Sequence, residues 1–339
     1  MILTLLLGGC SLLGGDPTAA IEAAEAALKA GDMTAASAAY DVALKDFPES
    51  VDVAVGAAYI KVLAGDAAGA DTILGGVEAS AAERMGDVKV RRALLAVQLE
   101  DLDKVKSYGK ESGLPLGALL AAEAELADGN REAARPLLES AKAAPGAVGV
   151  TAAQYLTLMA DTNPLVAGLS EAQALWALGQ RVVAVQSVGD LVKAYAETRE
   201  DGADQLLVWA GRSAAMGKGD IAVSLLDSIT VSPAGQKWRV DATRAMAACA
   251  SGDSVACIAG FDALDSLAAS TGGGIPSEGL ADARATAAMV IAGTDPASAR
   301  KLVENLRGDG AARVFTQVGD AAAAAAVVAD PFFKSQLGG

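Results

Sequence analysis

Alanine-rich apolar segments alternate with short polar turns along this chain of 339 residues. The segment from Pro17 to Gly31 carries small and apolar side chains at helical spacing and ends at the pair Gly31-Asp32, and a similar pair follows at Gly65-Asp66. Alanine favours helices because it loses no side-chain entropy on folding. Aromatic and β-branched residues rarely alternate at period two, as a half-buried strand would require. The pattern therefore predicts an all-α chain.

The first two turns lie 34 residues apart, and the residues around the first turn follow a fixed scheme. Ala24, Ala36 and Ala43 are small, Tyr40 is large and aromatic, and Pro48 ends the segment. Two antiparallel helices pack closely where small residues meet, a bulky residue fills the gap to the next hairpin, and proline ends the second helix. This scheme resembles the tetratricopeptide repeat (TPR) family. The resemblance implies a right-handed α-solenoid of TPR-like helical hairpins.

Later segments repeat the scheme less completely. Residues 51–84 place Ala58, Ala70 and Leu74 at the corresponding positions, and residues 115–145 form a further hairpin. More turns are predicted at Glu100-Asp101, Gly129-Asn130, Gly179 or Gly189-Asp190, Gly219-Asp220 and Gly252-Asp253.

The chain divides into four predicted segments. Residues 1–16 form a signal and tether, residues 17–146 the N-terminal TPR-like repeats, and residues 147–270 divergent helical repeats. Residues 271–339 begin with a Gly-Gly-Gly linker and continue as irregular helices at about 278–292, 296–307, 310–318 and 320–329. A solenoid needs caps because its open end exposes apolar surface, so these helices are expected to be the C-terminal cap.

The N-terminal segment is apolar through Leu7 and continues as Gly8-Gly9-Cys10-Ser11. This arrangement resembles the lipobox of bacterial lipoproteins, which implies cleavage before Cys10 and acylation of that cysteine. Each buried CH₂ of an acyl chain contributes about 0.8 kcal/mol, so several chains hold a protein firmly. A secretory signal normally begins with basic residues, and none precedes Cys10. Either the true start lies upstream, or the stretch is an apolar cap on the first helix.

Composition and charge remove several classes of function. The chain has no histidine, which is the commonest general base and metal ligand, and its three cysteines show no CxxC spacing. No metal and no cofactor is therefore expected. The net charge of −15 repels nucleic-acid phosphates and anionic headgroups, so membrane attachment is expected only through the lipid anchor or a partner.

Cys249 and Cys257 flank the predicted turn at Gly252-Asp253. In an oxidising compartment they could form a disulfide that joins two antiparallel helices. They could equally be two small buried residues, because free cysteine packs like a small hydrophobe.

Paired acidic residues are the remaining candidates for catalysis. Asp101 and Asp103, and Asp201 and Asp204, lie at predicted helix ends, where aspartate caps backbone N–H groups. No nucleophile elbow, phosphate loop or dinucleotide motif is present. We therefore expect a protein that is not an enzyme, with a carboxylate-based glycan-acting enzyme as the unlikely alternative.

The resemblance to TPR proteins implies a concave groove that grips a peptide or a partner helix. Side chains from the first helix of each hairpin would line it, and each of them could instead belong to the core between repeats. By position these residues are Ile21, Glu25, Leu28, Val55, Tyr59, Val62, Leu119, Glu123, Leu126, Trp209, Met216 and Met246.

The function expected from these observations is that of a lipid-anchored, periplasm-facing adaptor that binds an envelope protein or peptide segment. Ser11 after the lipidated cysteine favours the outer membrane under enteric sorting rules. The alternative is a structural subunit of a large envelope assembly, which would associate with itself or with other subunits.

Overall fold

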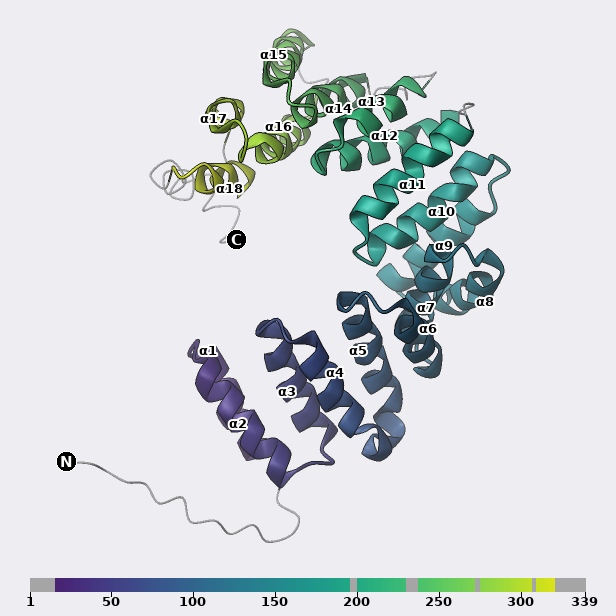
Figure 1. Ribbon diagram of the computed structural model, residues 1–339, viewed down its shortest axis with the longest axis vertical. Helices are drawn as coiled ribbons and strands as arrows, with labels where there is room; N and C mark the ends of the chain where they lie inside the picture. The colour runs from purple at the N-terminus through teal and green to yellow at the C-terminus, as the bar shows by residue number, and fades with distance from the viewer. Residues whose placement is uncertain (1–15, 196–199, 230–236, 272–274, 307–308, 321–339) are drawn as a thin grey trace, which may run out of the picture. The chain divides into compact units, whose positions relative to one another are not determined.

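The computed structural model describes residues 16–195, 200–229, 237–271, 275–306 and 309–320. Within these residues all regular secondary structure is helical (Figure 1). The helices of the N-terminal half are α1 (Thr18–Lys29), α2 (Met33–Asp46), α3 (Val51–Leu63), α4 (Ala67–Gly76), the 3-10 turns η1 (Glu78–Ser80) and η2 (Ala82–Arg84), α5 (Met85–Gln98), α6 (Leu102–Glu111), α7 (Pro115–Ala127), α8 (Arg131–Lys142) and α9 (Ala147–Met159). Those of the C-terminal half are α10 (Pro164–Ala177), α11 (Arg181–Ala194), α12 (Glu200–Ala215), α13 (Gly219–Asp227), α14 (Lys237–Ala250), α15 (Ser254–Thr271), α16 (Ser277–Ile291), α17 (Pro296–Val303) and α18 (Asp309–Gln317). The expected all-α fold is confirmed.

The chain forms two compact units, each a stack of antiparallel helical hairpins. The first unit extends through Thr157 and includes Ala177–Gly179, and the second comprises Leu158–Trp176 and the residues from Gln180 onward. Hairpins α1/α2, α3/α4, α5/α6 and α7/α8 build the first unit, and α12/α13, α14/α15 and α16/α17 belong to the second. The division between units falls inside α9 rather than at the segment boundary expected near residue 146.

One turn geometry recurs between the two helices of a hairpin. The residue that caps the second helix donates its backbone N–H to the carbonyl five positions earlier, and the residue before it has a positive φ. The residues with positive φ include Gly31 (77°), Gly65 (78°), Glu100 (57°) and Gly252 (84°). Aspartate follows each of these four, and its carboxylate accepts a hydrogen bond from the backbone N–H three residues on, at 2.8–3.1 Å. The Gly-Asp pattern thus supplies both the turn and the cap.

One predicted turn is displaced, and one that had two alternatives is decided. The turn expected at Gly219-Asp220 lies two residues earlier, where Gly217 has a φ of 70° and Lys218 donates its N–H to Ser213 at 2.9 Å. Gly219 is instead the buried first residue of α13, because a Cβ there would lie 2.6 Å from the Ala247 carbonyl oxygen of α14. Of the alternatives Gly179 and Gly189, the turn uses Gly179, and Gly189 lies inside α11.

The core of the first unit uses the small and aromatic positions expected from the sequence. Ala24, Ala36, Tyr40 and Ala43 are buried together with apolar residues of α3. A Cβ at Gly56 would lie 2.3 Å from the Tyr40 hydroxyl oxygen, so the tyrosine ring packs directly against the α3 backbone. The bulky residue therefore fills the gap to the next hairpin, as predicted.

In the second unit α12, α14, α16 and α18 pack successively against one another. One apolar core joins α14 and α15 to α16, α17 and α18, and it includes Phe261, Leu280 and Leu302. The expected segment boundary at residue 271 therefore lies within a single core, and α16/α17 continues the stack of hairpins. The helix expected at about 320–329 lies, beyond Asp320, outside the described residues.

Candidate functional site

Equivalent positions in successive hairpins identify a surface in the first unit. Tyr59 lies seven residues before the cap Asp66, and Leu94 lies seven residues before the cap Asp101. Both side chains are exposed, Tyr59 to 53% and Leu94 to 43%. The repeat thus places large apolar side chains in solvent at the same position of two adjacent hairpins.

We call this surface the α3–α5 apolar face and define it by the exposed side chains of Tyr59, Leu63, Leu94 and Leu99. Beneath the face, residues of α3 and α5 such as Ala58 share one core. That core also includes residues of α4, which packs against both helices, so the exposed side chains are presented from a rigid support. Large apolar side chains exposed on adjacent repeats suit a surface that binds another protein.

The structure divides the twelve predicted groove residues into two sets. Those that are exposed or half-buried are Ile21, Glu25, Leu28, Val55, Tyr59, Val62 and Met216. Those that are buried are Leu119, Glu123, Leu126, Trp209 and Met246. A buried side chain does not line an open groove, so the prediction is corrected for the second set. The physical reason in α7 is that neighbouring helices cover it on nearly every side, and every residue from Leu119 to Leu126 is buried.

Leu63, Leu94 and Leu99 were not among the predicted residues. The signal for Leu94 was present in the sequence, because it holds the position of Tyr59 relative to the turn. It was missed because the turn at Glu100-Asp101 lacks the glycine that marks the other turns. Leu63 and Leu99 lie at the ends of α3 and α5, where spacing alone does not decide exposure.

A polar network joins α4, α5 and α6 beneath the first unit's surface. The Arg92 guanidinium donates from Nε to Asp71 Oδ1 at 2.6 Å, from Nη1 to Glu78 Oε1 at 2.5 Å, and from Nη2 to the Tyr108 hydroxyl at 2.6 Å. Lys89 Nζ lies 2.9 Å from Glu78 Oε1. The hydrogen bond with Asp71 raises the pKa of Arg92 above its ordinary value. These bonds fix how the second hairpin packs on the third.

Glu123 is the most perturbed acid of the first unit. It is 6% exposed on α7, and burial raises the pKa of its carboxyl to about 7. The Tyr155 hydroxyl donates to its Oε1 at 3.1 Å and partly opposes the effect of burial. Glu123 corresponds to Tyr59 in the repeat, yet it is enclosed by its neighbours. It can hold a proton near neutral pH.

Two tryptophans pack together in the second unit. The rings of Trp176 and Trp209 meet edge to face, with centroids 5.8 Å apart and an interplanar angle of 89°. The Arg212 guanidinium lies 4.5 Å from the centroid of Trp209 and 4.7 Å from that of Trp176, and its Nη1 donates to Gln173 Oε1 at 2.7 Å. Trp209 is therefore a packing residue between α10 and α12.

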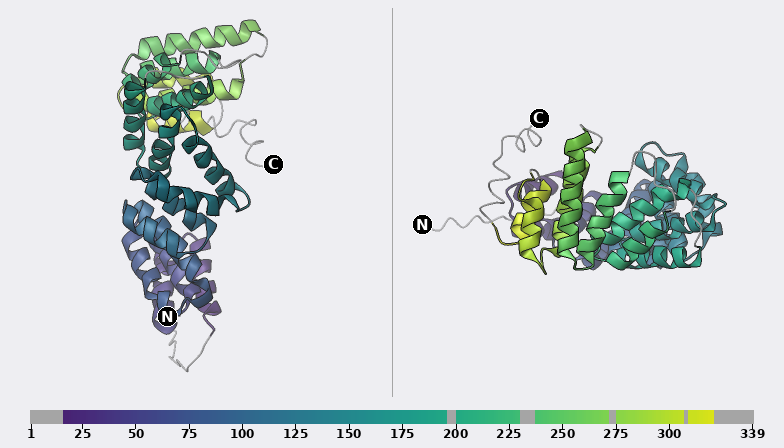
Figure 2. Two further views of the ribbon diagram at one scale, coloured as in Figure 1. Left: turned by 90° about the vertical axis from the view of Figure 1, so that its right-hand side faces the viewer. Right: turned by 90° about the horizontal axis from the view of Figure 1, so that it is seen from above.

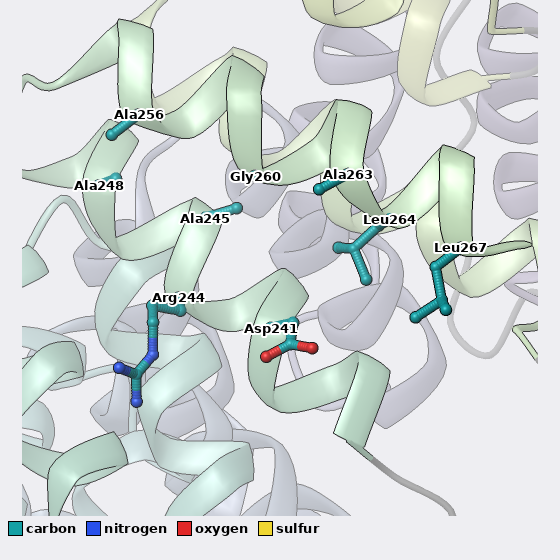
Figure 3. A pocket seen from close by; sticks show the side chains of 9 residues that line it. All are labelled: Asp241, Arg244, Ala245, Ala248, Ala256, Gly260, Ala263, Leu264 and Leu267. Atoms are coloured by element: carbon teal, nitrogen blue, oxygen red, sulfur yellow. The ribbon is translucent and has the colours of Figure 1, made fainter.

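A pocket of ≈ 450 Å³ lies between α14 and α15 of the same unit (Figure 3). Its α15 wall is formed by Ala256, Gly260, Ala263, Leu264 and Leu267, and its α14 wall by Asp241, Arg244, Ala245 and Ala248. Near the turn, Cys249 and Cys257 form a disulfide, with their Cα atoms 5.1 Å apart. Both cysteines are buried, and of the two interpretations of this pair the structure has the disulfide rather than two free thiols.

Two of the acidic residues considered for catalysis have structural contacts, and Asp204 is exposed on α12. Asp101 caps α6, and Asp103 Oδ1 lies 3.4 Å from Lys106 Nζ. No group of three or more potential metal-ligating side chains is found in the described part of the chain. No helix in the described ranges has the length and apolar character needed to cross a membrane. Cys10, the predicted lipidation site, lies outside the described residues.

Comparisons with known proteins add little to the assignment of the fold, which rests on the geometry described above. No family model and no curated protein matches the chain. Among solved structures it is similar to the crystal structure of the P58(IPK) TPR domain, at 14% sequence identity and a TM-score of 0.27, over 92% of this chain and 99% of that one. A likeness at that TM-score carries no argument by itself. The recurrent turns, caps and buried small residues show an all-α chain of TPR-like helical hairpins.

Proposed function

We propose that this protein is a non-catalytic adaptor that binds a partner protein through the α3–α5 apolar face. The observation that carries the proposal is the exposure of Tyr59 and Leu94 at equivalent repeat positions. Each such side chain removed from water on binding contributes about 1.5–3 kcal/mol. The helices beneath them are already ordered, so little conformational entropy is lost when a partner docks.

The site of action that we propose is the periplasmic face of a bacterial envelope membrane, most simply the outer membrane. The support is the Leu7-to-Cys10 sequence and the serine that follows it. An acylated Cys10 would hold the repeats near the membrane despite a net charge of −15. Mass spectrometry of the mature N-terminus tests this part, and a Cys10→Ser variant that stays in the membrane fraction and carries no lipid would contradict it.

The test of partner binding uses full-length protein purified from membranes of its host. The double variant Tyr59→Ala with Leu94→Ala removes the two side chains of the face that hold equivalent repeat positions. We expect one or two stoichiometric envelope proteins to co-purify with the wild type and to be lost, by at least about tenfold, from the double variant. The matched control is Val42→Ala, because Val42 is 57% exposed on α2, in the other helix of a hairpin.

Three results are informative. Loss of the partners in Tyr59→Ala/Leu94→Ala and their retention in Val42→Ala supports the adaptor. Unchanged co-purification in the double variant rejects the α3–α5 apolar face as the binding surface. An obligate oligomer of the chain itself, broken up by the double variant, supports instead a structural subunit whose face binds other copies. Circular dichroism melting checks that both variants fold, which is expected because all three side chains are exposed.

A further inference from the structure

The pocket between α14 and α15 has an apolar floor and belongs to no part of the α3–α5 apolar face. Along α15 the residues that line it recur at helical spacing, from Ala256 through Gly260 and Ala263 to Leu267. They therefore form one continuous stripe on a single side of the helix. At a rise of about 1.5 Å per residue the stripe is about 16 Å long, which is roughly three helical turns.

Two contacts hold the walls of this pocket together at one end. The Cys249–Cys257 disulfide joins α14 to α15 next to the turn. Farther along, a Cβ at Gly260 would lie 2.8 Å from the Ala245 Cβ, so the helix backbones approach closely there. Beyond this contact the helices diverge toward Asp241 and Leu267, and the pocket opens as a groove between them (Figure 3).

The second helix of the preceding hairpin does not extend along this groove. α13 ends at Asp227 after 9 residues, whereas α15 has 18. In Figure 2, α15 is the long light-green helix at the top of the left-hand view. Among the described elements α15 packs mainly against α14, with smaller contacts to α16 and α17. As far as the described residues go, its stripe of small and apolar side chains is thus left along an open edge of the stack, and Ala263 and Leu267 are exposed there.

The shape of the groove selects a helix as its occupant. Four alanines and one glycine line the walls, so a helix backbone can approach closely without meeting long side chains. Leu264 and Leu267 lie at the wide end, where apolar side chains from successive turns of a partner helix can contact them.

The net charge of the chain and the position of Asp241 favour a basic helix. The Asp241 carboxylate points into the mouth of the groove, whereas the Arg244 side chain points away from it (Figure 3). Arg244 Nη2 lies 3.6 Å from Asp227 Oδ1, and Asp241 Oδ2 lies 2.6 Å from Lys237 Nζ. The chain as a whole carries a net charge of −15, which attracts a basic partner and repels anionic lipid and a second copy.

We propose that the α14–α15 groove binds a basic amphipathic α-helix of a partner protein. The helix lays an apolar face with i, i+3/i+4, i+7 spacing along the α15 stripe and sets lysine or arginine side chains beside Asp241. This surface is separate from the proposed adaptor face, and either can operate without the other.

The probe is a synthetic peptide of about 18 residues with leucine and alanine on one face and lysine on the other, matched by a peptide in which glutamate replaces lysine. Each is titrated into the full-length protein at fixed ionic strength, with fluorescence anisotropy for affinity and hydrogen–deuterium exchange for location. We expect the lysine peptide to bind at least about tenfold more tightly than the glutamate peptide and to protect α14 and α15.

Two matched variants locate the binding site. Ala263→Arg places a long cation in the groove, and Ala269→Arg places the same side chain on the opposite side of α15, also in solvent. We expect Ala263→Arg to weaken lysine-peptide binding by about tenfold or more and Ala269→Arg to change it by less than about twofold. Tyr59→Ala should leave peptide binding unchanged, which separates this surface from the α3–α5 apolar face.

Four outcomes overturn the proposal. The first is equal affinity for both peptides, and the second is an equal effect of Ala263→Arg and Ala269→Arg. The third is a dimer in sedimentation that only Ala263→Arg disrupts, which would assign the groove to a second copy of the chain. The fourth is binding to phosphatidylglycerol vesicles that only Ala263→Arg alters while neither peptide binds, which would assign it to a membrane surface.

Discussion

The Tyr155 hydroxyl donates a hydrogen bond of 3.1 Å to Glu123 Oε1 in the interior of the first unit. Both residues are buried, Tyr155 at 1% and Glu123 at 6% exposure. One neutral donor does not replace the water that a carboxylate loses on burial, so the acid is held with a pKa of about 7. This pair gives the stability of the protein a defined dependence on pH.

We expect the free energy of unfolding to fall by about 3 kcal/mol, from this group alone, as the pH rises from the unfolded-state pKa near 4.5 to the folded-state pKa of about 7. The folded state binds the proton more tightly than the unfolded state does. The stabilisation is therefore complete below pH 4.5 and lost as the pH passes through 7. Urea unfolding between pH 4.5 and 8 measures it as the difference between wild type and Glu123→Gln.

Glu125→Gln is the matched control for that experiment. Burial raises the pKa of Glu125, but hydrogen bonds from Lys110 at 2.6 Å and from Asn130 at 3.2 Å outweigh it, and the net pKa lies below the ordinary value. The contribution of Glu125 to the free energy of unfolding is present at neutral pH and is lost on acidification. This pH dependence is opposite in sign to that of Glu123. Parallel pH profiles for Glu123→Gln and wild type would show that Glu123 has the same pKa in the folded and unfolded states.

Glu100 occupies the position that glycine holds in the turns at Gly31, Gly65 and Gly252, and its φ is 57°. A residue with a Cβ is strained in this left-handed region, whereas glycine is not. We therefore expect Glu100→Gly to raise the free energy of unfolding by about 1 kcal/mol. The reverse change, Gly65→Ala, should lower it by a similar amount. Denaturant midpoints at constant m-value measure both, and a destabilised Glu100→Gly would indicate that the carboxylate has a role of its own.

Arg92 joins Asp71, Glu78 and Tyr108 in a largely buried network. Removing the cation leaves Asp71 without its ion-pair partner and leaves Glu78 with Lys89 alone, so Arg92→Ala should cost about 3 kcal/mol. Arg92→Lys keeps the charge but cannot donate to all three groups at once. Its free energy of unfolding should therefore lie between those of the wild type and Arg92→Ala. Arg91→Ala on the exposed side of α5 is the control. Equal stabilities for Arg92→Ala and Arg91→Ala, measured by chemical denaturation, would show that the network contributes nothing net.

The Cys249–Cys257 disulfide closes a loop with a sequence separation of 8. On the chain-entropy model so short a loop stabilises the folded state by about 2.5 kcal/mol. We expect dithiothreitol to lower the denaturant midpoint of the wild type and to leave that of the double variant Cys249→Ala/Cys257→Ala unchanged. A wild-type midpoint insensitive to dithiothreitol would show that the two thiols are not joined in solution.

The sequence alone was enough to predict the hairpin architecture. Alanine at Ala24, Ala36 and Ala43 and the large ring of Tyr40 satisfy a close crossing that only such a pattern allows, and all four are buried as expected. The Gly-Asp turns at Gly31 and Gly65 were found at their exact positions because the left-handed residue and the capping carboxylate act locally, within a few bonds of each other.

Only the tertiary structure decided which side of each helix meets solvent. Tyr59 and Glu123 occupy equivalent repeat positions, yet the first is exposed and the second is enclosed. Likewise Trp209, which was predicted to line the groove, is buried against Trp176, whereas Leu94, which was not predicted, faces solvent. The register of a single hairpin follows from short-range steric and hydrogen-bonding rules. The exposure of its faces depends on the length and angle of neighbouring helices, and these are set by contacts between residues far apart in the sequence.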